Sequence, residues 1–191
     1  KPKGLLKVND IIDANNTHGG LTIVGSYVPK SSAQLKIALT HYSKDAIVEV
    51  DVSKVISDES ESYLKQLANL IDNKLSNGQD IIVFTSRKLV TGKDAVSNIN
   101  IAKQVSEALA YLVQSLKRRP KYLLAKGGIT SNDLALKGLG MKKSKVLGQI
   151  EYGIPVWEMG NETKFPHLLY IVFPGNVGDE HTLLNIINKL N

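Results

Sequence analysis

The chain has 191 residues, 42% of them hydrophobic, which suits one globular domain with an aliphatic core. It contains no cysteine, so disulfides and cysteine-based metal sites are excluded and a cytoplasmic location is expected. The formal net charge is +6, but the basic residues are spread over predicted helix surfaces and lack interleaved aromatics, which argues against a nucleic-acid partner. The apolar runs are too short to cross a bilayer, so no membrane association is expected.

Apolar runs and helical periodicity alternate along most of the sequence. In chain order we predict a strand at 21–24, a helix over 33–42, a strand at 46–52, a helix over 58–77, a strand at 80–84, a helix over 94–117, a strand at 121–125, a short helix over 134–137, two strands at 146–150 and 155–157, a strand at 168–173 and a final helix after Asp179. This alternation is typical of the α/β class. We therefore predict a three-layer α/β/α fold with a mostly parallel sheet and a small antiparallel hairpin.

Helix ends and apolar stripes give finer predictions. Ser31 or Ser32 is expected to cap the first helix, and Gly78 to end the second. Val96 and Ile99 share a periodic stripe with the apolar residues that follow them in the longest helix. We expect that whole stripe to face the core.

Three of the predicted strands end in small residues. Gly25-Ser26 follows the first strand, 127–130 (GGIT) follows the fourth, and 175–179 (GNVGD) follows the last. In open α/β sheets, ligands bind outside the carboxyl ends of the strands, and glycines there allow close approach to the backbone. Neither a Walker A sequence nor a GxGxxG pattern is present. The three strand ends together favour a nucleotide or phosphate pocket of a different kind.

The turn after the fourth strand is the centre of this prediction. Thr130 and Asp133 have the spacing of a capping box, with Asp in place of the usual Glu. A strand that turns through Gly127-Gly128 into a helix leaves backbone N–H groups without internal partners, which suits an anion. A plain tight turn explains the glycine pair equally well. We expect Gly128 to tolerate neither bulk nor a β-branched side chain.

Several longer motifs carry a resemblance to a known family. They are 126–133 (KGGITSND), 138–140 (GLG), 146–150 (VLGQI), 153–157 (GIPVW), 173–179 (FPGNVGD), and 24–26 (VGS) with Pro29 and Gln34. In this order they resemble the C-terminal domain of the four-carbon acid sugar kinase family. The similarity runs from about residue 20 to the end of the chain. The aspartate-rich signature that holds the acid in the N-terminal domain of that family has no counterpart here.

The resemblance implies a function and a division of labour. This chain would be the ATP-binding part of a kinase that phosphorylates four-carbon sugar acids of the threonate, erythronate or 3-oxo-tetronate type, with ATP and Mg²⁺ as cofactors. It implies that Ser26, Gly127, Gly128, Ile129, Thr130 and Gly175 contact ATP or ADP. The catalytic residues and the sugar-acid contacts would lie on a missing N-terminal domain. We accordingly expect residues 1–20 to be a linker or extension from that domain and residues 21–191 to be the nucleotide-binding domain.

Some alternatives stay open at this level. A nucleotide- or anion-binding regulatory module without catalysis would show the same strand ends. Asp133 and Asp179 are expected to cap helices rather than to influence a metal, and no metal-ligand set is predicted. Lys126 suits a phosphate or a salt bridge. Trp157 and Phe173 are expected in the core, and a homo-oligomer is left open.

Overall fold

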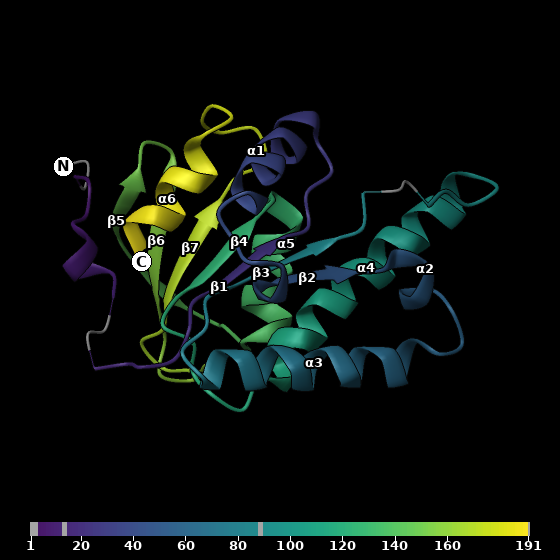
Figure 1. The fold of residues 1–191 in the computed structure, drawn as a ribbon, viewed down its shortest axis with the longest axis horizontal. Helices are drawn as coiled ribbons and strands as arrows, with labels where there is room; N and C mark the ends of the chain where they lie inside the picture. Colours follow the sequence, from purple (N-terminus) through teal and green to yellow (C-terminus); the bar gives the residue numbers. More distant parts are fainter. Residues whose placement is uncertain (1–3, 13–14, 88–89, 191) are drawn as a thin grey trace.

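The computed structural model describes residues 4–12, 15–87 and 90–190. Within these residues, seven strands form one sheet in the order β2-β3-β1-β4-β7-β6-β5 (Figure 1). The strands are β1 (Leu21–Val24), β2 (Ile47–Val50), β3 (Ile81–Thr85), β4 (Leu123–Lys126), β5 (Ser144–Glu151), β6 (Ile154–Met159) and β7 (Leu169–Phe173). The strands from β2 to β7 in this order pair in parallel, whereas β6 pairs antiparallel with both β7 and β5. The predicted mostly parallel sheet and its hairpin are confirmed.

Helices cover both faces of the sheet, because side chains alternate between the faces of a buried strand. On β3, Ile81 and Val83 belong to one core cluster and Ile82 and Phe84 to the other. The first cluster is covered by α2 (Val52–Val55), α3 (Ser60–Ser76), α4 (Ala95–Ser115) and the π-helical turn η3 (Leu134–Gly138). The short helix α5 (Gly128–Asp133) contacts α4 and η3. The second cluster is covered by α1 (Pro29–Leu39) and α6 (Thr182–Leu190), which contact each other. The predicted three layers are confirmed.

The hairpin of β5 and β6 forms one edge of the sheet, and Gly153 turns it with a φ of +77°. The segment before β1 lies against this edge. The N–H of Leu6 donates to the carbonyl of Gln149 over 2.8 Å, and Ile11 is fully buried. The segment also contains the short helix η1 (Val8–Asp10). That residues 1–20 lead in from a preceding domain stays a prediction, and residues 1–3 and 13–14 lie outside the described residues.

The start of α1 differs from the prediction. Neither Ser31 nor Ser32 caps it, because the helix already begins at Pro29, with Val28 at the N-cap and no side-chain cap bond. Proline fixes the φ angle that a first helical residue needs and gives up an N–H that the helix does not use there. Ser31 therefore lies inside the first turn, and its hydroxyl is free to donate to the carbonyl of Gly175.

The two halves of α4 have different environments. Asp94 caps the helix, accepting from the N–H of Ser97 at 2.7 Å, and the second half buries its apolar face from Val105 onward. The prediction that Val96 and Ile99 face inward is wrong, since they are 66% and 68% exposed. The apolar stripe is continuous in the sequence, but the first turns of α4 extend beyond the body of the molecule (Figure 1). The apolar period identifies one face of the helix, but it does not indicate which element packs against that face.

The helix after β4 also differs from its prediction. It begins at Gly128, six residues earlier than predicted, so Thr130 lies inside it and the capping box does not form. Gly127 is the N-cap residue and makes no side-chain cap bond. Asp133 is not a cap either: it accepts from the hydroxyl of Ser106 and from the ammonium of Lys137, at 2.6 and 3.0 Å. The carboxylate thereby joins α5 to α4.

Other local predictions hold in part, with shifted bounds. Gly78 follows the end of α3 with a φ of +78°, as expected for a helix stop. Asp179 accepts from the N–H of His181, but α6 begins at Thr182, so this carboxylate closes the turn before the helix rather than capping its first turn as predicted. The strand predicted at 46–52 is shorter, because Asp51 accepts from the N–H of Ser53 and starts α2. The short helix η2 (Lys44–Ala46) precedes that strand.

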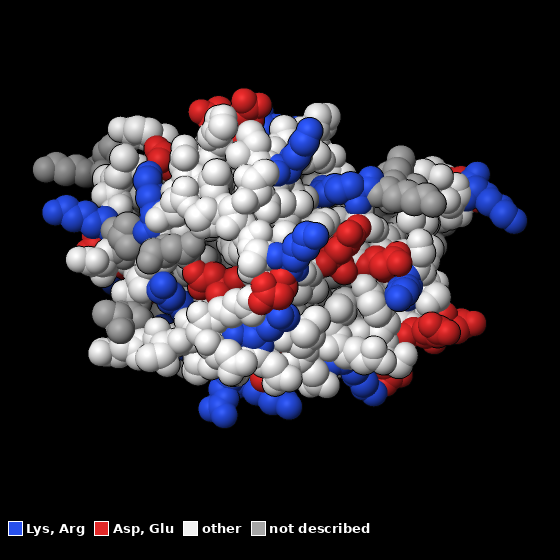
Figure 2. Space-filling view, in the orientation of Figure 1, with Lys and Arg blue, Asp and Glu red and all other residues white. Residues whose placement is uncertain are grey.

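The surface carries charges of both signs. Figure 2 shows acidic and basic side chains interspersed over the face drawn there, with no single basic stripe on it. The net charge of +6 is therefore not gathered on this face in the way expected of a nucleic-acid interface. Among the described residues, no helix is long and apolar enough to cross a membrane.

Candidate functional site

The three glycine-bearing strand ends lie next to one another. In the sheet, β4 lies between β1 and β7, and the register pairs Lys126 with Val24 on one side and with Phe173 on the other. The residues that follow these three positions therefore leave the same edge of the sheet together. Predicted contacts that are far apart in the sequence become neighbours through this pairing.

The glycines allow the three turns to converge. A Cβ atom on Gly25 would lie 2.3 Å from Thr130 Oγ1, and one on Gly127 would lie 3.0 Å from both Thr130 Oγ1 and the Cβ of Ser26. A Cβ on Gly175 would lie 3.1 Å from Ser26 Oγ. We call these five residues the strand-end cluster. Its two hydroxyls stand where the three backbones meet, and larger residues at the glycines would fill that space.

Gly127 and Gly128 have different roles. Gly127 is buried and has a φ of +121°, a conformation that residues with side chains rarely adopt. Gly128 is exposed and helical, and a Cβ there would meet nothing within 4 Å. The expectation that Gly128 resists a side chain for steric reasons is therefore wrong. The strained position is Gly127, while Gly128 borders open space.

The serine and threonine hydroxyls of this region fall into two groups. Ser31 Oγ donates to the carbonyl of Gly175 at 3.0 Å, and Ser131 Oγ donates to that of Ala125 at 2.8 Å. Ser26 Oγ and Thr130 Oγ1 have no hydrogen-bond partner in the part of the chain that the structure describes. The first pair maintains the fold. The second pair keeps its hydrogen-bonding capacity at the centre of the cluster.

Backbone donors face the same region. The N–H groups of Gly25 and Gly127 are used inside the sheet edge, by the carbonyls of Lys126 and Phe173. Ser131 makes the first helical bond of α5, to the carbonyl of Gly127, over 2.8 Å. The N–H groups of Gly128, Ile129 and Thr130 precede that bond and so lack helical acceptors. Ile129 contributes only its backbone to this region, because its side chain is 75% exposed.

Arg87 belongs to this region, although no role was predicted for it. It follows β3, the other neighbour of β1, and its guanidinium donates to the carbonyls of Ser26 and Val24 at 2.6 and 3.4 Å. It also lies over the ring of Tyr27, 5.4 Å from its centroid. Burial lowers the pKa of Arg87 from its usual value. The sequence does contain a signal for Arg87, because a basic residue just after a buried strand lies at the edge of the sheet where ligands bind.

Of the two contacts suggested for Lys126, the salt bridge does not form among the described residues, and the contact with a phosphate stays a prediction. Its side chain is completely buried, and its ammonium donates to the carbonyls of Pro174 and Gly175 at 2.9 and 3.1 Å. It also lies 3.8 Å from the centroid of the Phe173 ring, which is in the core as predicted. Trp157 is half-buried and stacks on Tyr170. Lys126 thus ties the turn after β7 to β4.

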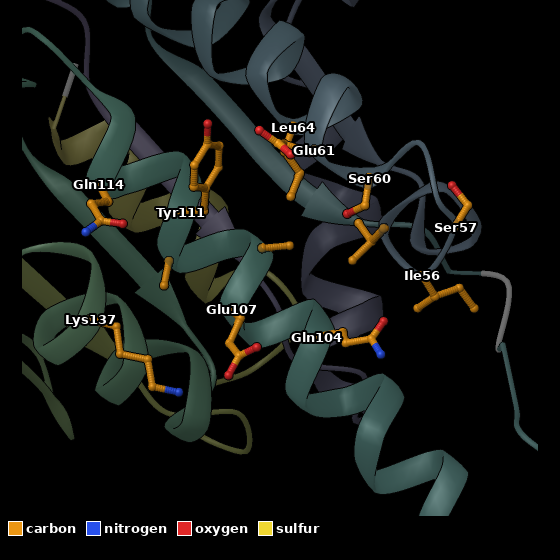
Figure 3. A pocket seen from close by; sticks show the side chains of 13 residues that line it. Ile56, Ser57, Ser60, Glu61, Leu64, Gln104, Glu107, Tyr111, Gln114 and Lys137 are labelled. Carbon is orange, nitrogen blue, oxygen red and sulfur yellow. The ribbon is translucent and has the colours of Figure 1, made fainter.

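A separate hollow lies elsewhere on the molecule. A groove of about 650 Å³ lies between α2 and α3 on one side and α4 on the other, and Figure 3 shows the labelled side chains of α3 and α4 along it. Its lining includes Glu61, Leu64, Gln104, Glu107, Tyr111 and Lys137 and no residue of the strand-end cluster. The described residues hold no group of three or more His, Cys, Asp or Glu side chains placed to bind a metal. We call this hollow the helical groove.

Comparison with known proteins gives one family and several structures. Residues 21–183 match the model of a family described as nucleotide-binding C-terminal domain. None of the curated proteins matches the sequence significantly. Three solved structures share the fold. A Salmonella typhimurium LT2 protein, provisionally described as a tRNA synthase, is 18% identical with a TM-score of 0.70. A Haemophilus influenzae protein assigned to DUF1537 is 20% identical with a TM-score of 0.68.

The third structure is a Bordetella bronchiseptica DUF1537 domain, crystallised with bound citrate as a domain-swapped dimer, with 14% identity and a TM-score of 0.69. At such identities the likeness to all three shows the fold alone. Each comparison covers 91% of this chain but only 40%, 40% and 41% of the three structures in turn. The chain therefore spans about two-fifths of the length of these proteins.

Proposed function

The chain belongs to the family of nucleotide-binding C-terminal domains, as found in the four-carbon acid sugar kinases, and we propose that its strand-end cluster binds the phosphates of ATP or ADP. We further propose that the domain serves a kinase of four-carbon sugar acids, of the threonate, erythronate or 3-oxo-tetronate type. The sugar acid and the catalytic residues would then be held by a preceding domain, to which residues 1–20 lead.

One observation carries the placement of the nucleotide. Ser26 Oγ and Thr130 Oγ1 are without protein partners among the described residues, while the neighbouring hydroxyls of Ser31 and Ser131 are engaged. Neither oxygen is among the buried side-chain atoms that lack a partner, so both reach the surface, where an anion with several acceptor oxygens can accept from the two hydroxyls. The unbonded N–H groups at the start of α5 add donors beside them.

The residues present fit a nucleotide better than a metal bound by the protein alone. Glycine at positions 25, 127 and 175 leaves the cluster open to phosphate oxygens. Mg²⁺ prefers several waters and phosphate oxygens with only one or two carboxylates, so it needs no set of protein ligands here. When bound, MgATP supplies the phosphoryl group for transfer to a hydroxyl. The part of this chain is to position the phosphates and stabilise their charge, on which such transfer mainly depends.

Calorimetric titration with MgATP and MgADP tests the proposal. We expect the purified chain to bind both, and to show no turnover of threonate or erythronate in a coupled kinase assay. Ser26→Ala and Thr130→Val should each weaken binding by roughly tenfold or more, since a hydrogen bond to a charged group contributes about 1.5–3 kcal/mol.

Ser57→Ala is the matched control for these variants, because its exposed hydroxyl donates only to the local carbonyl of Lys54. It should bind like the unchanged protein. Failure of the chain to bind either nucleotide would contradict the proposal, and so would unchanged affinity in both cluster variants. Robust turnover of a sugar acid by the purified chain would contradict the division of labour.

A further inference from the structure

Lys126 is a buried lysine whose amine contacts only neutral acceptors. Its side chain has 0% relative exposure, and its Nζ donates to the carbonyls of Pro174 and Gly175. In the described part of the chain it forms no ion pair with a carboxylate. Lysines are almost never buried without such a partner, because removing an ammonium from water is costly.

The charged group that acts on Lys126 has the same sign. Burial and, as the smaller cause, the charge of Lys30 on α1 together lower the pKa of Lys126 from 10.5 to about 7. The turn after β7 offers Lys126 backbone carbonyls and the ring of Phe173. The carboxylate of that turn, Asp179, is engaged by the N–H of His181 and the hydroxyl of Thr182. Near neutral pH the protein therefore holds Lys126 in a mixture of its two protonation states.

The number of donors distinguishes the two states. A neutral amine has two N–H bonds, which matches the two carbonyls. Protonation adds a third N–H and a positive charge, which among the described residues meet only the face of the Phe173 ring. An anion in the strand-end cluster would favour the protonated form, because an opposite charge nearby stabilises an ammonium.

The same contacts join Lys126 to the cluster. The carbonyl of Gly175 accepts from Lys126 Nζ and also from Ser31 Oγ, at 3.1 and 3.0 Å. The α-carbon of Gly175 faces Ser26 Oγ. In sequence, Lys126 directly precedes Gly127, the N-cap residue of α5. The amine thus fixes two of the three strand ends relative to each other, from beneath the place proposed for the phosphates.

We propose that Lys126 is a positioning residue that holds the Gly175 turn against β4 and takes up one proton from solvent when a nucleotide binds. This inference rests on the function proposed above. In the free protein the amine needs no proton to keep its two hydrogen bonds. In the complex the added proton places a positive charge beside the polyphosphate. The affinity for nucleotide should therefore fall as pH rises above neutrality.

Proton uptake is measured by titrating MgATP calorimetrically at one pH in two buffers that differ in ionisation enthalpy. A pH of about 8 places most of the free Lys126 in its neutral form. The unchanged protein should take up as much as about one proton per nucleotide bound. Lys126→Arg keeps a positive charge that does not titrate and should take up none. Lys65→Met, on an exposed residue of α3, is the control and should behave like the unchanged protein.

If Lys126→Arg does not fold, the pH dependence of the nucleotide affinity is a second test of the proposal. Between about pH 8 and 9, the affinity of the unchanged protein and of Lys65→Met should fall by as much as about tenfold per pH unit. Equal proton uptake in the unchanged protein and Lys126→Arg would overturn the role of Lys126, as would an affinity independent of pH over this range. Binding without proton uptake would leave the proposed function intact. Absence of any nucleotide binding would overturn both.

Discussion

The strand-end cluster and the helical groove differ in how their polar groups are held. In the cluster, three strand ends from distant parts of the sequence meet around two unpartnered hydroxyls, with a buried lysine and an arginine bonded to the surrounding carbonyls. In the groove, the polar side chains come from exposed helix surfaces, and Glu107 forms only an ion pair with Lys103, one helical turn away. The groove is a hollow of about 650 Å³, yet the cluster is the more elaborately organised.

The two regions therefore differ in how many distant segments position their polar groups. A groove between helix surfaces arises wherever two helices diverge, and its side chains remain solvated. The cluster and its surroundings have structural costs: a glycine at a φ of +121° and a buried amine. Costs of this kind gather at functional sites. The comparison therefore supports the cluster as the nucleotide site, and four experiments test this assignment.

The largest expected effect is on folding. Gly127→Val should lower the free energy of unfolding by about 3 kcal/mol or more, because it combines backbone strain with crowding of Ser26 and Thr130. Gly128→Ala should leave that free energy within about 0.5 kcal/mol or raise it, since the position is helical and open. Urea denaturation of both variants measures the contrast. Equal losses at the two glycines would contradict the assigned roles.

The next effect is on affinity. Gly128→Ala should weaken MgATP binding several-fold while the fold persists, because a methyl group would stand between the start of α5 and the phosphates. Calorimetric titration measures the MgATP affinity of Gly128→Ala, once its melting temperature is found to be unchanged. If the folded variant binds as tightly as the unchanged protein, the phosphates do not lie against this turn.

A smaller effect concerns stability and pH. Lys126 has a pKa of about 7 in the folded protein and an ordinary value of 10.5 when unfolded, so the unfolded chain binds more protons between these values. The free energy of unfolding should therefore rise with pH between these two values, and this rise should be absent in Lys126→Met. Chemical denaturation at pH steps from about 7 to 9.5 measures it. A curve for Lys126→Met that runs parallel to that of the unchanged protein would show that Lys126 titrates normally.

The smallest effect is expected in the helical groove. Glu107→Ala and Gln104→Ala should change the free energy of unfolding by no more than about 0.5 kcal/mol, as surface substitutions usually do. Neither should alter the affinity for MgATP. Calorimetry and denaturation on the same preparations test both statements. A tenfold loss of nucleotide affinity in either variant would move the binding site from the strand ends to the groove.

The sequence was sufficient for the fold and for the grouping of the strand ends. Apolar runs such as those of β3 and β7 locate buried strands, and their alternation with helices implies a parallel sheet. Gly25-Ser26, Gly127-Gly128 and Gly175 were placed at one edge because parallel strands end at the same edge. Their mutual contacts depend on strand order, with β4 between β1 and β7, which no local pattern specifies.

The sequence did not reveal which residues are exposed or which distant segments they contact. Val96 and Ile99 fit the helical stripe of α4 but lie beyond the elements that would cover them. The spacing of Thr130 and Asp133 fits a capping box, yet Gly127 starts the helix earlier, because its φ angle allows the turn without a side-chain cap. Lys126 and Arg87 bond to carbonyls of neighbouring turns, which are contacts between distant segments.

The crystal structure of the chain with ADP bound is the most direct measurement of the central claim. It should place the phosphates within about 3 Å of Ser26 Oγ, Thr130 Oγ1 and the N–H groups of residues 128–130, the distance of a hydrogen bond. Gly175 should lie beside them, with the Lys126 amine still bonded to its carbonyl. Phosphates located in the helical groove, or anywhere away from both hydroxyls, would contradict the account.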